Sequence, residues 1–379
     1  MNVPKLRFKE FNDEWNRDKI GNFVIINSGD SPSKFEFYNQ GIPYYKVEQL
    51  NNCLKYQVQT PYYINTNKVI PKGSIIFPKR GAAILLNKIR ILNLDSFFDT
   101  NIMSLTTNGI NNEFLYYYLI KENLSNIADT SSIPQLNNKH IEPYPLIYPR
   151  SSKEQEMVGK TLQLLDKKIE LQTKKIEDLK LFKKGLIKDI FSADNLKSVY
   201  IKDLGTVITG TTPSKDNKNY WDNGFIAWIT PTDITYDRDI STSITSLTEV
   251  GLEKGRYVPK NSVLVTCIAS IGKNAVLKVD GSCNQQINAI IPNNNYKSNY
   301  IYYLMEYISP YLQSIAGTSA TAIVNKETFE NVKVNVHSFS EQLKIDKYLS
   351  SIESKILLEY KLLNKLFELK KGLMQNMFV

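Results

Sequence analysis

Six polar loops carry the side chains of this 379-residue sequence that are best suited to binding a ligand. They cover residues 28–34, 79–81 and 131–139 in the first half, and residues 209–218, 270–274 and 317–326 in the second. Lysine and arginine bind phosphates, whereas glutamine, asparagine, serine and threonine can read the edges of DNA bases. The candidate DNA-binding residues are Lys34, Arg80, Ser132, Gln135, Lys215, Lys273, Ser319 and Thr321. The alternative interpretation is that these loops are solvated surface.

The charge balance favours a polyanionic partner. The chain holds 47 Lys and Arg against 38 Asp and Glu, a formal net charge of +9, and the basic residues are interleaved with Tyr, Asn, Ser and Thr. Such a pattern is typical of nucleic-acid binding. Other moderately basic proteins bind no nucleic acid, so charge alone does not decide the function.

Residues for catalysis or metal binding are scarce. The three cysteines, Cys53, Cys267 and Cys283, have no CxxC spacing, so we expect reduced, buried thiols and no structural zinc site. His140 and His337 are the only histidines. The sequence contains no phosphate-binding P-loop, no GxGxxG, no GxSxG and no Asn-Pro-Pro or Asp-Pro-Pro tract. We therefore expect a non-catalytic chain without a metal.

An internal repeat sets the order of the domains. Residues 154–191 align without a gap with residues 341–378, at an offset of 187. The segments before them repeat loosely: Ser31-Pro32-Ser33-Lys34 returns as Thr212-Pro213-Ser214-Lys215. The predicted order is a globular domain over 1–150, a helix over 151–195, a second domain over 196–338 and a second helix over 339–379.

The repeated helices have the apolar spacing of coiled-coil strands, with steps of four and three. The predicted seam consists of Leu162, Leu165, Ile169, Gln172, Ile176 and Leu179 in the first helix, and Leu349, Ile352, Ile356, Glu359, Leu363 and Leu366 in the second. Polar residues interrupt both seams at matching places, Gln172 with Glu359 and Lys183 with Lys370, as they do where register or orientation must be fixed. Two helices joined through a globular domain most simply lie antiparallel. The alternative is an amphipathic helix packed on its own domain.

Each globular domain reads as a mixture of strands and helices, which gives an α+β fold. We expect strands over residues 19–27, 73–77 and 84–92 in the first domain, and over 199–209, 225–230, 262–267 and 275–279 in the second. A helix is expected over 113–122 and over 299–312.

The first fifteen residues mix charged and apolar side chains, unlike the apolar core of a signal peptide. No apolar run approaches the ~20 residues of a membrane helix. We expect a cytoplasmic protein that does not enter a membrane.

Several segments together resemble a known family, the specificity subunits of type I restriction enzymes. The similarity covers nearly the whole chain. It is carried by the opening Pro4-Lys5-Leu6-Arg7-Phe8 through Trp15, the run from Leu204-Gly205 to Asp233, the helix endings Lys183-Lys184-Gly185-Leu186 and Lys371-Gly372-Leu373-Met374, and Ser132-Ile133-Pro134-Gln135-Leu136. The second domain has Ala320-Thr321-Ala322-Ile323-Val324 in place of the last motif, so a base-reading role for Gln135 cannot be copied there.

The resemblance implies two target-recognition domains separated by a helical pair. Such a chain would bind double-stranded DNA with a two-part target and dock two copies of a methyltransferase subunit, followed by restriction subunits that translocate and cleave. S-adenosylmethionine, ATP and magnesium would bind those partners, and no cofactor would bind this chain. Methylation would occur on an adenine that the partner extrudes.

Two other functions share some of these features. A stand-alone sequence-specific DNA-binding protein would also have basic domains, but it has no need for a duplicated helical surface. A protein scaffold without a DNA role would need neither.

Overall fold

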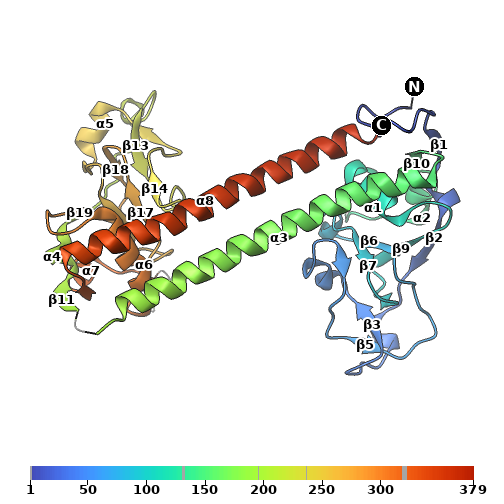
Figure 1. The fold of residues 1–379 in the computed structure, drawn as a ribbon, viewed down its shortest axis with the longest axis horizontal. Coiled ribbons are helices and arrows are strands. Elements are labelled where there is room, and N and C mark those ends of the chain that lie inside the picture. The colour runs from blue at the N-terminus through green and yellow to red at the C-terminus, as the bar shows by residue number, and fades with distance from the viewer. Residues whose placement is uncertain (1, 130–132, 195, 236, 318–321) are drawn as a thin grey trace. The chain divides into compact units, whose positions relative to one another are not determined.

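The chain has an α+β fold made of two compact units, each with its own sheets. A computed structural model describes residues 2–129, 133–194, 196–235, 237–317 and 322–379. Unit 1 comprises Met1–Leu171 with Leu363–Val379, and unit 2 comprises Gln172–Leu362. Two long helices, α3 (Ser152–Phe191) and α8 (Phe339–Asn376), are divided between the units, so that one part of each helix belongs to unit 1 and the other part to unit 2 (Figure 1).

Unit 1 contains three sheets. A five-stranded sheet has the order β2-β9-β6-β7-β4, a three-stranded sheet has the order β5-β3-β8, and β1 pairs with β10. The strands are β1 (Asn16–Lys19), β2 (Val24–Ser28), β3 (Ile42–Tyr45), β4 (Tyr56–Gln57), β5 (Tyr63–Ile64), β6 (Ile75–Pro78), β7 (Arg90–Leu92), β8 (Phe97–Phe98), β9 (Ile102–Thr107) and β10 (Pro145–Tyr148). The helices of this domain are α1 (Asn112–Glu122) and α2 (Asn138–Ile141).

Unit 2 repeats this topology strand for strand. Its sheets have the orders β12-β19-β16-β17-β14, β15-β13-β18 and β11-β20. The strands are β11 (Lys197–Tyr200), β12 (Gly205–Thr209), β13 (Ile226–Ile229), β14 (Asp239–Ile240), β15 (Ser246–Leu247), β16 (Val263–Thr266), β17 (Asn274–Leu277), β18 (Gly281–Cys283), β19 (Ile287–Pro292) and β20 (Lys333–Val336). The helices are α4 (Ile201–Leu204), α5 (Glu249–Lys254), α6 (Ser298–Ser314) and α7 (Lys326–Glu330). The predicted duplication is therefore present in the fold as well as in the sequence.

Both faces of each five-stranded sheet are buried, which explains why successive residues of its central strands β6 and β16 are mostly apolar. In β6, Ile75 and Phe77 join a core shared with the helices, whereas Ile76 points into a second core shared with the three-stranded sheet. In β16, Val263 and Leu264 divide in the same way. Successive side chains of a strand point to opposite faces, so one short strand supplies both cores.

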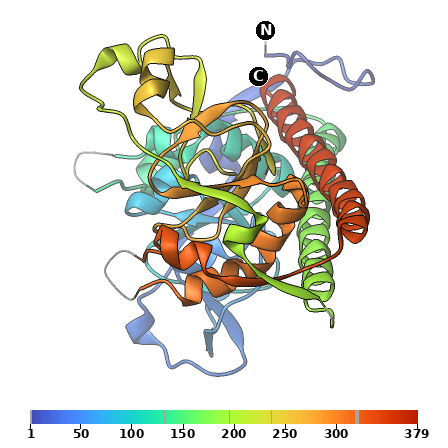
Figure 2. The ribbon, with the colours of Figure 1, turned by 90° about the vertical axis from the view of Figure 1, so that its left-hand side faces the viewer.

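The two long helices lie side by side and antiparallel within each unit. In unit 2, Gln172 of α3 contacts Glu359 of α8 and Lys183 contacts Glu353, so residue numbers rise along one helix as they fall along the other. The unit 2 segments of both helices lie along one side of its sheets (Figure 2). In unit 1, Lys370 of α8 contacts Asp166 of α3.

Each helix starts on one core and ends on the other. Val158 and Leu162, near the start of α3, belong to the unit 1 core, whereas Ile187 and Phe191, at its end, belong to the unit 2 core. The second helix does the reverse: Leu349 lies in the unit 2 core, while Met374 of its last turn and Met377 and Phe378 just after it pack in the unit 1 core.

Three predicted strands are wrong in part, because a helical turn interrupts each of them. The segment 19–27 contains a 3₁₀ helix (Ile20–Phe23), 84–92 begins in another (Ala82–Leu86), and 199–209 contains α4. In α4, Ile201 and Leu204 are both buried, and a spacing of three puts them on one side of a helical turn. The other predicted strands and both predicted helices are confirmed to within two residues.

The part of the chain that the structure describes contains no helix that is both long enough and apolar enough to cross a membrane.

Candidate nucleic-acid interface

The same polar loop is built at the same end of both five-stranded sheets. In unit 1 it leaves β2 at Gly29, whose backbone N–H donates to Ile102 O at 3.4 Å; in unit 2 it leaves β12 at Gly210, whose N–H donates to Ile287 O at 3.0 Å. A Cβ at Gly29 would lie 2.0 Å from Phe98 O, and one at Gly210 would lie 2.2 Å from Cys283 O. Only glycine allows the backbone to pass this close to the neighbouring strand.

A buried aromatic donor anchors each loop one residue later. Tyr44 OH donates to Asp30 O at 2.8 Å, and Trp228 Nε1 donates to Thr211 O at 3.0 Å. Burial raises the pKa of Tyr44, so its hydroxyl stays protonated and remains a donor. The two domains thus hold the first turn of the loop with different side chains but the same hydrogen bond.

In unit 1 the loop carries a small basic cluster. Lys34 Nζ and Lys68 Nζ both lie 2.8 Å from the carboxylate of Asp30. These hydrogen bonds from Lys34 and Lys68 lower the pKa of Asp30 to about 2. Both lysine side chains are more than half exposed, so each can exchange this carboxylate for a phosphate at little cost.

Arg80 and Gln135 meet at the same end of the unit 1 sheet. Their backbones form a β-bridge, and Leu136 N donates to Lys79 O at 2.8 Å. Lys79 Nζ donates to Ser28 Oγ at 2.8 Å, which joins this pair to the loop that follows β2. Arg80 is exposed and Gln135 is half-buried. Lys34, Arg80 and Gln135 are therefore brought to one sheet end.

In unit 2, Lys215 and Lys273 lie at the corresponding sheet end, and both are exposed. Lys215 is on the loop after β12, and Lys273 is in the turn between β16 and β17. The last residues of β12 and β16 pair with neighbouring positions of β19, which places both loops at that end.

The segment that replaces the Gln135 motif occupies the same place in unit 2. Ala269 N donates to Ala322 O at 3.0 Å and Val324 N to Cys267 O at 2.9 Å, matching the bonds from Gly81 to Pro134 and from Leu136 to Lys79. Ile323 therefore stands where Gln135 stands. Ser132, Ser319 and Thr321 lie outside the described residues.

Sequence reasoning missed a second basic residue that both loops share. Lys68 in unit 1 contacts Asp30, and Arg256 in unit 2 donates from Nη1 to Thr209 O at 2.9 Å. Each directly precedes a repeated landmark, Val69-Ile70-Pro71-Lys72 and Tyr257-Val258-Pro259-Lys260. Aligning the two domains on that landmark would have identified the pair.

Of the predicted seam residues, Gln172 and Glu359 contact each other across α3 and α8, whereas Leu162, Leu349, Ile352 and Ile356 pack in the domain cores. Eleven of the twelve are buried, and Leu179 is partly buried. At the first polar interruption, Gln172 Nε2 donates to Glu359 Oε2 at 2.7 Å and to Glu359 O at 3.0 Å. At the second, Lys183 and Lys370 instead contact residues outside the seam as well as the opposite helix.

The buried cysteines offer no activated nucleophile. Burial raises the pKa of both the Cys267 and the Cys283 thiol to about 12, so they remain protonated near neutral pH. Within the described ranges, no three His, Cys, Asp or Glu side chains are placed to hold a metal ion.

Residues 12–181 and 193–368 each match the family model described as type I restriction modification DNA specificity domain. One similar protein is the type I restriction enzyme MjaIX specificity subunit of Methanocaldococcus jannaschii, 37% identical over 162 residues, or 41% of this chain and 37% of that one. Another is the type I restriction enzyme HindI specificity subunit of Haemophilus influenzae, 31% identical over 139 residues, or 35% of this chain and 30% of that one. The match spans about a third of the length of these relatives.

Two solved structures share the fold over nearly the whole chain. The S subunit of a type I restriction-modification system from M. genitalium aligns with a TM-score of 0.64 at 15% identity, covering 100% of this chain and 99% of that one. A chain from a structural study of complex assembly and conformational transition of the type I R-M system aligns with a TM-score of 0.62 at 15% identity, covering 96% of this chain and 97% of that one.

Proposed function

The chain belongs to the family of type I restriction modification DNA specificity domains, and from that premise we propose that it reads a two-part DNA target, one half with each domain. The observation that carries this proposal is the duplicated loop of the two sheets. The loop carries Lys34 in unit 1 and Lys215 in unit 2 at matching positions, and Lys68 and Arg256 contact it from the segments before β6 and β16. Basic residues at fixed positions bind phosphates and set the register of a protein on the duplex.

The residues around this shared loop differ between the two domains, and we infer that they read bases. Gln135 in unit 1 is replaced by Ile323 in unit 2. A glutamine amide pairs well with adenine in the major groove, whereas an apolar side chain fits a thymine methyl group. Two domains with the same phosphate contacts and different base contacts would read two different half-sites.

The long helices would dock the partner subunits. They carry exposed apolar side chains at repeated positions, Leu171 with Leu358 and Phe182 with Leu369. The same surface presented twice suits two copies of one partner, and we assign it to two methyltransferase subunits, with the restriction subunits joining them. S-adenosylmethionine, ATP and magnesium would bind those subunits, where the methyl transfer and cleavage would take place.

Neutralising the basic loop residues tests DNA reading. Lys34→Ala and Lys215→Ala should each reduce the salt dependence of DNA binding by about one unit of slope and weaken different sequences about equally. Lys72→Ala and Lys260→Ala are matched controls, because both lysines are exposed and precede the central strands β6 and β16 at the opposite sheet end. If all four variants keep the slope of the unaltered chain, the loops do not bind DNA.

Two measurements separate the alternatives. A stand-alone DNA-binding protein would show the salt-dependent binding but would not retain a purified methyltransferase subunit of its own system. A scaffold without a DNA role would retain the subunit and show no salt-dependent binding to DNA.

A further inference from the structure

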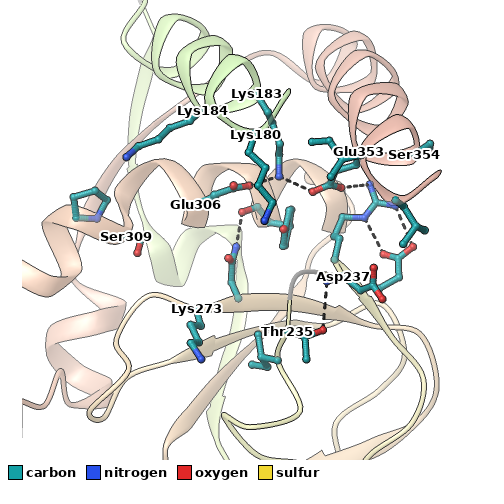
Figure 3. Close-up of a pocket in the computed structure, with 18 of the residues that line it drawn as sticks. Lys180, Lys183, Lys184, Thr235, Asp237, Lys273, Glu306, Ser309, Glu353 and Ser354 are labelled. Atoms are coloured by element: carbon teal, nitrogen blue, oxygen red, sulfur yellow. Dashed lines mark hydrogen bonds and ion pairs between the residues drawn. The ribbon is translucent and has the colours of Figure 1, made fainter. Parts of the chain in front are cut away.

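A chain of four polar side chains ties the unit 2 domain to both long helices. Lys183 Nζ of α3 lies 2.6 Å from Glu353 Oε1 of α8, and Tyr303 of α6 donates from its hydroxyl to Glu353 Oε2 at 2.9 Å. Arg238, next to β14, completes the chain by donating from Nη1 to the Tyr303 hydroxyl oxygen at 3.0 Å. Figure 3 shows Lys183 reaching from its helix between Glu353 and Glu306.

Unit 1 contains the same chain of contacts. Lys370 Nζ of α8 lies 2.6 Å from Asp166 Oδ1 of α3, and the Tyr117 hydroxyl of α1 donates to Asp166 Oδ2 at 2.7 Å. Lys55, next to β4, donates from Nζ to the Tyr117 hydroxyl oxygen at 2.8 Å. The order of the contacts is the same in both units: a lysine of one long helix, a carboxylate of the other long helix, a tyrosine of the domain helix, and a basic residue beside the sheet.

These residues occupy equivalent backbone positions. Lys183 and Lys370, like Asp166 and Glu353, are separated by the repeat offset of 187. Lys55 and Arg238 each accept a hydrogen bond on the backbone oxygen from the neighbouring strand, from Ile91 N at 2.8 Å and from Val276 N at 2.7 Å. The two domains share only scattered sequence landmarks, yet both keep this chain.

We propose that these two series of side-chain contacts are orientation joints. In each joint, Lys183 or Lys370 acts as a positioning residue that holds the recognition domain at a fixed angle on its helix pair. The joints would thereby fix the number of unspecified base pairs between the two half-sites. This inference rests on the function proposed above. It gives the second polar interruption of the seam a role distinct from that of the Gln172–Glu359 pair.

A polar joint suits this task because its contacts are directional. Apolar packing gains free energy from buried area in any orientation, whereas charge-assisted hydrogen bonds require a particular geometry. Lys183 is only 8% exposed and bridges Glu353 of α8 and Glu306 of α6, so a rotation of the unit 2 domain would take Glu306 away from this buried ammonium. In unit 1, burial lowers the pKa of Lys55, and its ammonium pairs with Glu113 of α1 as well as with the Tyr117 hydroxyl.

The two joints differ in their surroundings. The unit 2 joint lines a cavity of about 870 Å³, and Glu306 stands there at the position that Ile120 occupies in unit 1. Because side chains do not fill this cavity, packing restrains the orientation of the unit 2 domain on its helices less tightly. That orientation therefore depends more on the polar contacts. Lys183 is also more buried than Lys370, which is 27% exposed. We expect the loss of Lys183 to have the larger effect.

The first test measures the joint without DNA. Spin labels on Glu177→Cys of α3 and Asn294→Cys of the unit 2 domain, both exposed sites, report the distance between helix and domain in the full chain carrying Cys53→Ser. Lys183→Met should broaden the distance distribution, Lys183→Arg should largely restore it, and Lys174→Met, at an exposed site on the same helix, should leave it unchanged. A distribution unchanged by Lys183→Met would overturn the joint.

The second test maps methylated sites in cells that carry the complete system. With Lys183→Met we expect both half-site sequences to be kept, while sites appear whose spacer differs by about one base pair, ~3.4 Å of duplex. A single unchanged spacer, despite a broadened distance distribution, would refute the link between joint and spacing. If the unaltered chain directs no methylation to a two-part site, the proposed function fails, and the spin-label result still decides whether the joint exists. Should Lys183→Met abolish methylation, Glu353→Gln, which keeps the side-chain shape, takes its place in both tests.

Discussion

The buried pair Gln172 and Glu359 allows a sharp test of how the helix contact is held. Each lies in the seam with 8% of its surface exposed, and Gln172 Nε2 donates to both the carboxylate and the backbone oxygen of Glu359. Lys175 Nζ lies 2.6 Å from the other carboxylate oxygen, but this lysine is half exposed. We expect Gln172→Leu and Glu359→Leu to be destabilising singly and close to neutral together.

The magnitudes follow from which groups lose a partner. Gln172→Leu leaves a mostly buried carboxylate with Lys175 alone, at a cost of about 1–3 kcal/mol. Glu359→Leu should cost less, because the Gln172 amide keeps the backbone oxygen at 3.0 Å. The double variant leaves no unpaired polar side chain in the seam and adds apolar contact. Its free energy of unfolding should therefore be within about 1 kcal/mol of that of the unaltered chain, or higher. The single effects should therefore not add.

Hydrogen exchange of the amides in residues 172–180 of α3 and 355–362 of α8 is the appropriate assay, because it reports local opening in a chain with two units. Lys174→Met on the exposed face is the control and should leave exchange unchanged. A double variant as destabilised as the sum of the two single variants would show that the pair is not coupled. The hydrogen bond from Gln172 also lowers the pKa of Glu359, so this pair stabilises the helices above the ordinary carboxyl pKa of 4.5 and ceases to do so on acidification. Gln172→Leu should reduce that pH dependence.

Three further outcomes are expected. Gly29→Ala and Gly210→Ala should each lower the free energy of unfolding by about 1–3 kcal/mol or more, because the added Cβ would lie 2.0 and 2.2 Å from backbone oxygens. Thermal unfolding would measure this loss of stability, and DNA affinity would report the displaced loop. Burial raises the pKa of Glu306, so the free energy of unfolding should fall as pH rises from the ordinary value of 4.5 through the raised one; Glu306→Gln should flatten that slope in urea titrations at several pH values. Exchange of residues 200–336 for those of a relative should change only one half of the methylated motif, and a change in both halves would show that the domains do not read independently.

The helices could be predicted from the sequence because their signal is periodic and local. Apolar steps of four and three over residues 158–190 define one face of a helix whatever surrounds it. Their ends also followed from the repeat, since residues 154–191 and 341–378 lie almost wholly within α3 and α8.

The strands were harder to predict, because partners far along the chain decide them. The segment 199–209 reads as one extended run, yet the Asp203 carboxylate accepts from Tyr200 N at 2.8 Å and closes a helical turn within it. Central strands such as β9 and β19 gave little alternation, because both of their faces are buried. The basic pair Lys68 and Arg256 was missed because each residue reaches its loop across the fold.

The two polar interruptions of the seam show that one sequence signal can have two structural causes. A polar residue at a seam position predicts that register or orientation must be specified, but it does not say between which elements. Gln172 meets its own repeat counterpart, Glu359, so this interruption specifies how one helix lies against the other. Lys183 and Lys370 do not meet each other, since one contacts residues of unit 2 and the other residues of unit 1. In an antiparallel pair of repeats, only positions near the middle can face their own counterparts, whereas positions towards the ends must face something else. That geometry is why the outer interruption was available for attaching each domain, and why it could be kept while the domains around it diverged.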